Sequence, residues 1–492
     1  MSKSITTAIP YTFAKSNGIV VTALTDGMAE VAVRDGAQAL AIAEVRRVLG
    51  MPLRARRVGG DEFEGLMSAL YNGTGEGAAA LALDIAQDID LSRLLQEIPR
   101  IEDLLESQDD APVIRLINAL FTQALRDGAS DIHIEPFETR SVVRLRIDGM
   151  LRDLLEPARA LHAAIVSRVK IMAQLDIAEK RLPQDGRIAL RVAGKPIDVR
   201  VSTIPTGHGE RVVLRLLDKQ AGRLDLTKLG MDEAMLAQMD RLIREPHGIV
   251  LVTGPTGSGK TTTLYAALSR LDAKSLNIMT VEDPIEYDLD GISQTQINAR
   301  IDMSFARALR TILRQDPDVV MIGEIRDLET AQIAVQASLT GHLVFATLHT
   351  NDGVSAVTRL VDMGVEPFLL ASSLIGVGAQ RLVRCLCTEC RKPVTTDAQQ
   401  LQALGFTPME GTVHAAQGCP ACNQSGYRGR TGIYELITVE DDLRRLIHDQ
   451  VSEQQLREHV AALGMRSLRQ DGMRWVAQGV TSLEEVVRVT RE

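Results

Sequence analysis

The residues best suited to chemistry form a glycine-rich run that begins at Gly254, with the sequence Gly-Pro-Thr-Gly-Ser-Gly-Lys-Thr. The run matches the pattern G-x-x-x-x-G-K-[ST], in which glycines let backbone N–H groups turn inward onto phosphate oxygens. Lys260 would add a positive charge near the β- and γ-phosphates, and the Thr261 hydroxyl would hold Mg²⁺. The pattern predicts a nucleotide site formed by Gly254, Pro255, Thr256, Gly257, Ser258, Gly259, Lys260, Thr261 and Thr262.

Apolar runs place this loop and a second acidic residue on a predicted sheet. Residues 248–253 have the pattern of a buried strand before the loop, and residues 261–268 that of a helix after it, which a chance glycine-rich turn would lack. Another buried strand is predicted at 318–324, with Glu324 at its carboxyl end. Because parallel sheets collect their chemistry at the carboxyl ends of strands, we predict that Glu324 orients the attacking water or binds magnesium through water. An ordinary strand-end glutamate is the alternative.

Three carboxylates cluster after a strand expected at 276–281, namely Glu282, Asp283 and Glu286. Such clustering is costly unless a cation or a base role justifies it. We predict that Glu282 helps Glu324 to position or deprotonate water. Asp283 and Glu286 are expected to act on metal or on domain geometry instead.

Two histidines flank another predicted strand, His342 before it and His349 after it. A lone histidine is more often structural than catalytic, and for His342 both interpretations remain open. His349 follows the carboxyl end of the strand, where it can sense the γ-phosphate. We therefore include His349 among the predicted catalytic residues.

Four of the five cysteines form two close pairs, Cys387-x-x-Cys390 and Cys419-x-x-Cys422, with 28 residues between the pairs. Two such pairs can supply four thiolates in a tetrahedron, the geometry of a closed structural zinc site without an open catalytic position. A redox dithiol or unligated cysteines are the alternatives, because the intervening loop is longer than in common zinc ribbons. Cys385 is expected to be buried or free.

Length and composition restrict the class of protein. The 492 residues suggest about three domains. A net charge of -9 and an aromatic content of 3% disfavour a general nucleic-acid binder. The first residues do not show the basic start and apolar run that are typical of a secretory signal. The longest charge-free apolar stretch, residues 367–380, is shorter than the roughly 20 residues that span a bilayer. We expect a cytoplasmic protein that reaches a membrane only through a partner.

Changes in pattern divide the first part of the chain. Residues 1–84 resemble a small α/β unit, with strands near 18–24 and 28–33 and a helix near 37–49. Residues 85–110 contain eight acidic and two basic side chains, which suits an exposed linker.

The remainder divides into two larger parts. Residues 111–222 are predicted to form an α+β domain with helices near 113–127 and 161–175 and a loop at 181–187. In residues 223–492 the pattern strand, loop, helix repeats, which predicts a parallel sheet with helical crossovers.

Together, the four nucleotide-site motifs resemble the Walker A, Asp box, Walker B and His box of the secretion ATPases, the motors of type II secretion, type IV pili and DNA uptake. These motifs are at 254–261, 280–286, 323–327 and 340–349. The family's Walker B motif typically reads Gly-Glu, so Gly323 before Glu324 does not signal an inactive site. The resemblance implies an α/β fold: a RecA-like P-loop ATPase core, a preceding α+β (PAS-like) domain, a small N-terminal α/β domain and a zinc-binding subdomain.

The second domain also carries segments that resemble this family, at 129–136, 181–187, 198–203 and 209–217. By this resemblance Arg200 and Arg215 would neutralise charge that develops on the γ-phosphate, from the same chain or a neighbour. Arg310, Arg314 and Arg326 near the Walker B strand would complete the cluster. Surface arginines in weak ion pairs are the alternative.

The two ends of the chain indicate a branch of the family. Pilus and type II assembly ATPases carry a tetracysteine zinc subdomain, which implies such a subdomain at 383–430 and a C-terminal helical region at 431–492. Residues 9–21 and 44–53 resemble the first domain of the type II secretion ATPases, the GspE family, which docks on the platform protein GspL.

The resemblance thus implies a homo-hexameric ATPase, peripheral on the cytoplasmic face of the inner membrane, with GspL-type and GspF-type partners and with ATP, Mg²⁺ and Zn²⁺ bound. Hydrolysis would drive pseudopilus assembly and the export of folded proteins across the outer membrane. A pilus-assembly or DNA-uptake ATPase, a nucleic-acid translocase and a non-catalytic nucleotide-gated scaffold are the alternatives.

Overall fold

The structure, a computed structural model, describes residues 17–25, 27–34, 39–59, 62, 63, 66, 111–192, 195–218, 225–298, 301–395 and 412–491. The predicted linker at 85–110 lies outside these residues. The chain forms two compact units, residues 1–122 and 123–492. The helix α7 (Ala111–Arg126) contains the boundary between them.

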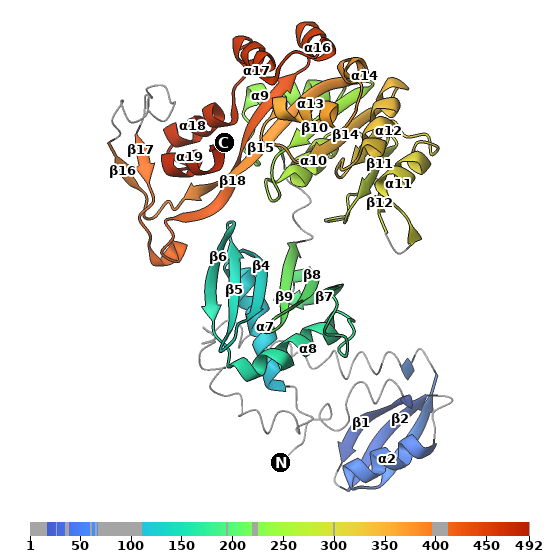
Figure 1. The fold of residues 1–492 in the computed structure, drawn as a ribbon. Coiled ribbons are helices and arrows are strands. Elements are labelled where there is room, and N and C mark those ends of the chain that lie inside the picture. Colours follow the sequence, from blue (N-terminus) through green and yellow to red (C-terminus); the bar gives the residue numbers. More distant parts are fainter. Residues whose placement is uncertain are drawn as a thin grey trace. The chain divides into compact units, whose positions relative to one another are not determined.

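In its described residues, the first unit has a small sheet covered by the helix α2, as the sequence predicts (Figure 1). Its described elements are β1 (Ile19–Thr25), β2 (Met28–Arg34), α2 (Ala39–Leu49) and β3 (Leu53–Val58). The strand β2 is central, antiparallel to β1 and parallel to β3. Its alternating residues Val31 and Val33 join Val45 of the helix in the core, because successive side chains of a strand point to opposite faces.

The second unit begins with an antiparallel sheet whose described strands have the order β6-β5-β4-β9-β8-β7 (Figure 1). The elements are β4 (Ala129–Pro136), β5 (Ser141–Ile147), β6 (Met150–Leu155), η3 (Arg159–Leu161), α8 (His162–Met172), β7 (Gln184–Val192), β8 (Lys195–Thr206) and β9 (Gly209–Asp218). One face of the sheet is apolar and buried, with Ile132, Val201 and Leu214 each at most 1% exposed.

The predicted loop at 181–187 is only partly correct, because β7 begins at Gln184 and its first four residues pair with β8. Gly186 is not a turn residue here. A Cβ at this position would lie 2.7 Å from the carbonyl oxygen of Ala173 and 2.9 Å from the side chain of Leu175. The glycine therefore lets the strand approach the end of α8 closely.

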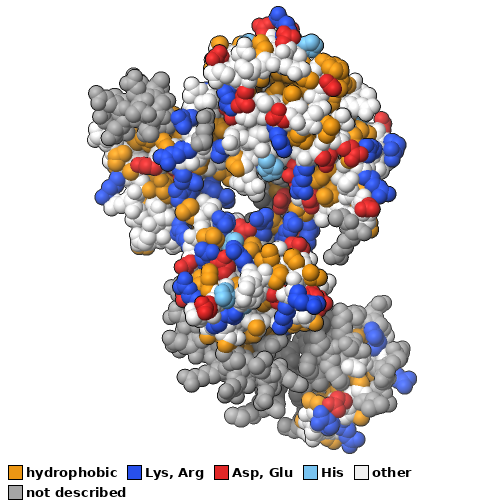
Figure 2. All heavy atoms as spheres, in the orientation of Figure 1, with side chains coloured by type: hydrophobic (Ala, Val, Ile, Leu, Met, Phe, Trp, Pro, Cys, Tyr) orange, Lys and Arg blue, Asp and Glu red, His pale blue; other side chains and the backbone are white. Residues whose placement is uncertain are grey.

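A row of charged residues crosses the other face of this sheet. Arg215 of β9 lies opposite Arg200 of β8 and opposite Asp131 of β4, and Arg200 lies opposite Arg187 of β7. Asp131 is 4% exposed and accepts a hydrogen bond of 2.9 Å from Nε of Arg215. In the view of Figure 2, the visible side of this domain carries basic side chains interspersed with acidic and hydrophobic ones.

The rest of the second unit is built on a twisted sheet whose described strands have the order β12-β11-β13-β14-β10-β15-β18. The strands are β10 (Gly248–Thr253), β11 (Ile278–Glu282), β12 (Ser293–Gln296), β13 (Val319–Ile322), β14 (Leu343–Leu348), β15 (Leu374–Leu386) and β18 (Tyr427–Thr438). Neighbouring pairs are parallel, as predicted, except that β18 runs antiparallel to β15.

Helices cover both faces of this sheet (Figure 1). They are α9 (Glu233–Leu242), α10 (Lys260–Leu268), α11 (Phe305–Ile312), α12 (Leu328–Leu339), α13 (Gly353–Asp362) and α14 (Pro367–Ser373). Alternate residues of one strand enter two cores: Leu251 packs with α11, α12 and α13, whereas Val250 and Val252 pack with α9 and α10. The strands are buried on both faces, which explains their continuous apolar sequences.

The C-terminal part of the chain consists of the segment between β15 and β18, the two longest strands of the sheet, and of the helices after β18. The cysteine region lies between β15 and β18 and includes β16 (Lys392–Val394), β17 (Val413–Ala415) and η6 (Pro420–Cys422). Four helices follow: α16 (Asp441–His448), α17 (Glu453–Ala462), α18 (Leu468–Ala477) and α19 (Leu483–Thr490). Within the described ranges, no helix is both long and apolar enough to cross a membrane.

Candidate nucleotide and metal sites

The four predicted nucleotide motifs come together because they follow the carboxyl ends of four adjacent parallel strands. The strands β11, β13, β14 and β10 are consecutive in the sheet. The glycine-rich loop follows Thr253, which pairs with Leu348 directly before His349. Glu324 lies two residues beyond Ile322, which pairs with Val281 directly before Glu282. The topology thus collects loops that are far apart in the sequence at one edge of the sheet.

The glycine-rich loop joins β10 to α10 and depends on its glycines at two places. Gly254 has φ +145°, and a Cβ there would lie 2.4 Å from the carbonyl oxygen of Gln380. Gly259, the residue before α10, has φ +89°. These conformations direct the loop tightly around the start of the helix, where free N–H groups favour an anion.

The loop buries one hydroxyl group and one ammonium group. Ser258 is 4% exposed, and its Oγ has no hydrogen-bond partner in the described part of the chain. Nζ of Lys260 donates to the carbonyl oxygens of Gly254 at 2.8 Å and Pro255 at 3.2 Å. Burial lowers the pKa of Lys260 to about 8, and the charge of Glu324 opposes this shift. A buried ammonium and an unpaired hydroxyl at a helix N-terminus fit a phosphate group.

Glu324 is held from both sides. Its Oε2 lies 3.1 Å from Nε2 of His349, and its Oε1 forms an ion pair with Arg326. Arg326 also lies 3.6 Å from Asp283 of the Asp box. The structure therefore brings Glu324, His349 and Arg326 together beside the loop that carries Lys260.

His342 lies at the other end of β14. Its Nδ1 is 2.9 Å from the carbonyl oxygen of Ala337 near the end of α12, and 3.2 Å from Oγ1 of Thr340. These contacts stabilise the connection between α12 and β14 at the edge of the sheet opposite to Glu324. They favour the structural interpretation of His342.

Glu282 occupies a separate, buried network. It is 2% exposed, and its Oε1 accepts hydrogen bonds from Thr280 at 2.5 Å and from Gln294 at 3.1 Å. Its Oε2 accepts a hydrogen bond from the hydroxyl of Tyr265, a residue of α10. Both carboxylate oxygens are thus occupied by protein donors, and none of these donors belongs to the glycine-rich loop.

Glu286 faces the arginine row of the second domain. Burial raises the pKa of Glu286, and the positive charges of Arg215, Arg200 and Arg187 oppose this shift. Arg187 also donates to Oε1 of Gln296, beside the Asp box, at 3.3 Å. The predicted Arg200 and Arg215 therefore lie near the Asp box rather than on a remote surface.

Three residues beside the Asp box have no predicted role, and one of the predicted arginines lies on an exposed surface. Arg187 lies within the segment 181–187 that resembles the family but has no predicted role, and the sequence pattern gives no role to Tyr265 or Gln294. A tyrosine within the otherwise apolar stretch of α10 was the available signal. Of the additional arginines, Arg310 pairs with Glu329 on an exposed surface.

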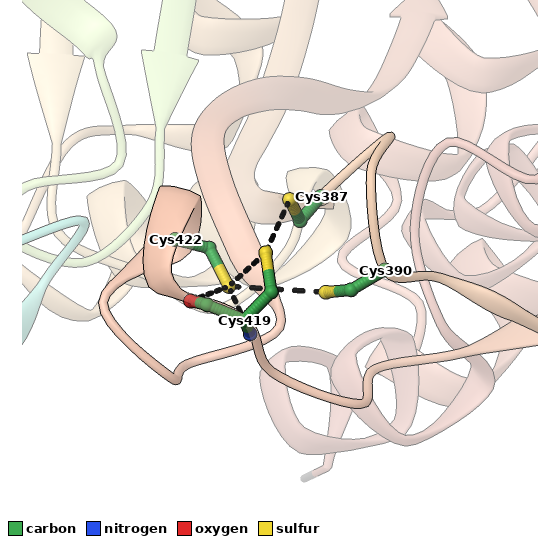
Figure 3. Close-up of side chains that lie close together, drawn as sticks. All are labelled: Cys387, Cys390, Cys419 and Cys422. Atoms are coloured by element: carbon green, nitrogen blue, oxygen red, sulfur yellow. Dashed lines mark hydrogen bonds between the residues drawn. The ribbon is translucent and has the colours of Figure 1, made fainter.

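The four predicted metal cysteines converge from two turns (Figure 3). Their sulfur atoms all lie within 4.8 Å of one another. The Sγ–Sγ distances are 3.8 Å for Cys387–Cys419, 3.8 Å for Cys390–Cys422 and 3.7 Å for Cys419–Cys422. A tetrahedron of thiolates with Zn–S bonds of about 2.3 Å has edges of about 3.8 Å. The cysteine geometry fits a structural zinc ion.

Backbone donors support this cysteine cluster. Sγ of Cys422 accepts hydrogen bonds from the N–H groups of Cys419 and Gly426, both at 3.2 Å. Such donors stabilise a coordinating thiolate and orient it. Cys385 is not part of the cluster and lies on β15, half-buried, where burial raises its pKa to about 11.

Comparison with known families agrees with this arrangement of motifs. The chain matches the family described as "Type II/IV secretion system protein" over residues 106–488, and over residues 8–71 it matches a domain family of "GSPII protein E". The chain belongs to the type II/IV secretion system protein family.

Individual relatives in this family cover almost the whole chain. "Type II secretion system protein HxcR" from Pseudomonas aeruginosa is 65% identical over 98% of this chain and 99% of its own length. "Type II secretion system ATPase E" from Vibrio cholerae is 58% identical over 92% of this chain and 90% of its own.

Solved structures show the same RecA-like fold. The pilus retraction motor PilT with bound ADP is 26% identical, covers 76% of this chain and 97% of its own, and has a TM-score of 0.52. The Legionella pneumophila ATPase DotB, 18% identical, covers 76% of this chain and 94% of its own with a TM-score of 0.56, which supports the fold alone.

Proposed function

We propose that this protein hydrolyses ATP as the motor of a type II secretion system. The observation that carries the proposal is the convergence of Lys260, Glu324 and His349 at one edge of the sheet, beside a loop whose buried polar atoms fit phosphate. The relative from Vibrio cholerae named "Type II secretion system ATPase E" supports the assignment. The match to a domain of GSPII protein E favours the type II branch over pilus assembly or DNA uptake.

The reaction is an in-line attack of water on the γ-phosphate of ATP. Backbone N–H groups of 254–261 and the ammonium of Lys260 hold the phosphates. Thr261 and Glu324 would hold Mg²⁺, which neutralises charge on the β- and γ-oxygens when bound. His349 and Arg326 fix the carboxylate of Glu324 from both sides.

In this proposal, the carboxylates Glu282 and Glu286 of the Asp box have different roles. Glu282 was predicted to act on water beside Glu324, but both of its oxygens are engaged by buried protein donors. We assign Glu282 the positioning of the Asp box. Glu286 faces the arginines and has a raised pKa, so it is the better candidate to orient or accept a proton from water.

Arginines of the second domain supply the remaining positive charge. Arg200 and Arg215 lie opposite each other on β8 and β9 and act on Glu286. Preorganised cations stabilise charge that develops in the transition state, because they need no reorganisation during the reaction. We propose that these arginines move between Glu286 and the γ-phosphate as the second domain closes on the core.

The cysteine cluster has a structural role in this proposal. Cys387, Cys390, Cys419 and Cys422 would hold one Zn²⁺, and a closed set of four thiolates leaves no position for substrate. The ion would fix the segment between β15 and β18, two long strands of the ATPase sheet.

The proposed assembly rests on the resemblance to the family. We propose a homo-hexamer on the cytoplasmic face of the inner membrane, which docks through residues 1–84 on a GspL-type platform protein and also contacts a GspF-type protein. Hydrolysis would drive growth of a pseudopilus that moves folded proteins across the outer membrane.

The test is ATP turnover by the purified full-length chain, with and without the cytoplasmic domain of a GspL-type protein, beside Lys260→Ala. Turnover that the partner stimulates and Lys260→Ala abolishes is the expected result. Lys260-dependent turnover without binding or stimulation would keep the ATPase but contradict the type II assignment. Turnover unaffected by Lys260→Ala would overturn the nucleotide site.

A further inference from the structure

A buried tyrosine connects the helix of the glycine-rich loop to the Asp box. Tyr265 lies on α10, five residues after Lys260, and is 1% exposed. Its hydroxyl donates to Oε2 of Glu282 at the end of β11. The same hydroxyl oxygen accepts hydrogen bonds from the backbone N–H of Glu286 at 3.4 Å and from Nε2 of Gln294 at 3.3 Å.

Gln294 completes the connection from the other side of the Asp-box segment. From β12, its Nε2 reaches Oε1 of Glu282 at 3.1 Å and the carbonyl oxygen of Tyr287 at 3.2 Å. Its Oε1 accepts a hydrogen bond of 2.7 Å from the N–H of Leu289. The segment that carries Glu286 is thus attached at three backbone positions to Tyr265 and Gln294.

We propose that Tyr265 is a positioning residue for ATP hydrolysis, whose hydroxyl holds the segment of Glu286 in register with the helix of Lys260. This inference rests on the proposed function, in which Glu286 acts on the attacking water. Tyr265 acts through Glu286 and Glu282 and does not touch the phosphates.

The role belongs to the hydroxyl and not to the ring. The ring packs edge-on against Tyr287 with centroids 4.7 Å apart, and phenylalanine would retain that contact. Phenylalanine would leave one oxygen of the buried Glu282 without its donor and the N–H of Glu286 without its acceptor. Burial and the charge of Glu282 raise the pKa of Tyr265, so the hydroxyl keeps its proton as a donor.

The experiment compares Tyr265→Phe with Tyr287→Phe in the full-length chain, by steady-state kinetics for ATP and by thermal unfolding. Tyr287 is the matched control, because its hydroxyl has no hydrogen-bond partner within the described residues and its ring is in the same cluster. We expect kcat to fall about 10-fold in Tyr265→Phe with KM changed less than about twofold, since a small misplacement of a reacting group acts on the chemical step. Tyr287→Phe should retain the wild-type kcat.

A double-mutant cycle with Glu286→Gln tests the route of action. If Tyr265 acts through Glu286, adding Tyr265→Phe to Glu286→Gln lowers the residual kcat no further. Gln294→Met, which keeps the chain length but removes the amide, should reproduce the kcat defect even if Tyr265→Phe folds poorly.

Three results would overturn the inference: wild-type kcat in both Tyr265→Phe and Gln294→Met, an equal loss in Tyr287→Phe, or additive losses in the cycle. Full activity of Glu286→Gln would instead overturn the proposed role of Glu286. Loss of turnover in Glu286→Gln, with wild-type rates in the other variants, would leave the proposed function intact and remove only the role of Tyr265.

Discussion

Nε2 of His349 lies 3.1 Å from Oε2 of Glu324, and this contact joins the loops that follow β14 and β13, two adjacent parallel strands. Glu324 is only 16% exposed, and its other oxygen pairs with Arg326. The carboxylate therefore has little freedom to rotate. A carboxylate fixed in this position suits the proposed ligand of Mg²⁺, which must keep its place while water attacks the γ-phosphate in line.

Replacing His349 should impair the chemical step more than nucleotide binding. We expect His349→Asn to lower kcat about 10- to 100-fold, because Glu324 loses one of its two supports, while the affinity for ATP changes less than about threefold. The matched control is His342→Asn at the other end of the same strand, where the ring forms hydrogen bonds to Ala337 at the end of α12 and to Thr340, the residue after it. Equal losses in both variants, measured by turnover and nucleotide binding, would contradict the assignment.

The affinity for ATP should fall as pH rises above about 8. The pKa of Lys260 is lowered to about 8 by burial, so the nucleotide-free protein loses this charge in mildly alkaline solution. Phosphates favour the ammonium form, and binding above this pH must therefore take up a proton. Titration calorimetry at pH 9 in two buffers of different ionisation enthalpy would measure that uptake.

Lys260→Arg is the control for this pH dependence. An arginine stays charged throughout the range, so its binding, although weaker, should vary little between pH 7.5 and 9.5. Wild-type affinity that stays constant over this range would show that Lys260 is not the group that titrates.

The nucleotide site could be predicted from sequence because its motifs are local and their position on a parallel sheet is fixed by topology. Strand, loop and helix around Lys260 were recognisable, and the carboxyl ends of neighbouring strands then had to meet. The roles of Glu282 and Glu286 could not be divided in this way. Glu282 is the carboxylate that accepts hydrogen bonds from the protein, and its donors Tyr265 and Gln294 come from other elements of the fold.

Two other features could be predicted only in part from the sequence, each for a physical reason. Gly186 had the pattern of a loop glycine, but it serves close packing within β7 beside Ala173. The long gap between the cysteine pairs left the zinc site ambiguous. In the structure, β15 and β18 run antiparallel and bring the two pairs together whatever the length between them.

Removal of metal should destabilise the cysteine region. We expect about one zinc per chain, and Cys390→Ser should release it and lower the temperature of unfolding, because structural zinc contributes folding free energy. Metal content by atomic emission and the midpoint of thermal unfolding are the measurements. Cys385→Ser is the control, since this thiol is outside the cluster and the variant should keep its zinc. Full stability of the zinc-free protein would contradict a structural role.

Acid should weaken the attachment of the last helix. The side chain of Glu485 on α19 is fully buried, which alone would raise its pKa, but hydrogen bonds from Arg488 and Arg384 hold its pKa at about 2. In the unfolded chain this pKa is about 4.5, so the unfolded state binds the proton more readily. The stabilisation is complete above about pH 4.5 and is lost as pH falls towards 2, and it amounts to roughly 3 kcal/mol.

Glu485→Gln tests this attachment against its exposed neighbour Glu484. Removing the charge leaves Arg384 on β15 with a weaker partner in a buried position, so we expect the midpoint of thermal unfolding at pH 7 to fall by several degrees. Between pH 5 and 3 the variant should lose less stability than the wild type, because it no longer takes up that proton. Glu484→Gln should behave as the wild type at both ends of the range. If Glu485→Gln retained the full acid sensitivity, another carboxylate would have to account for it.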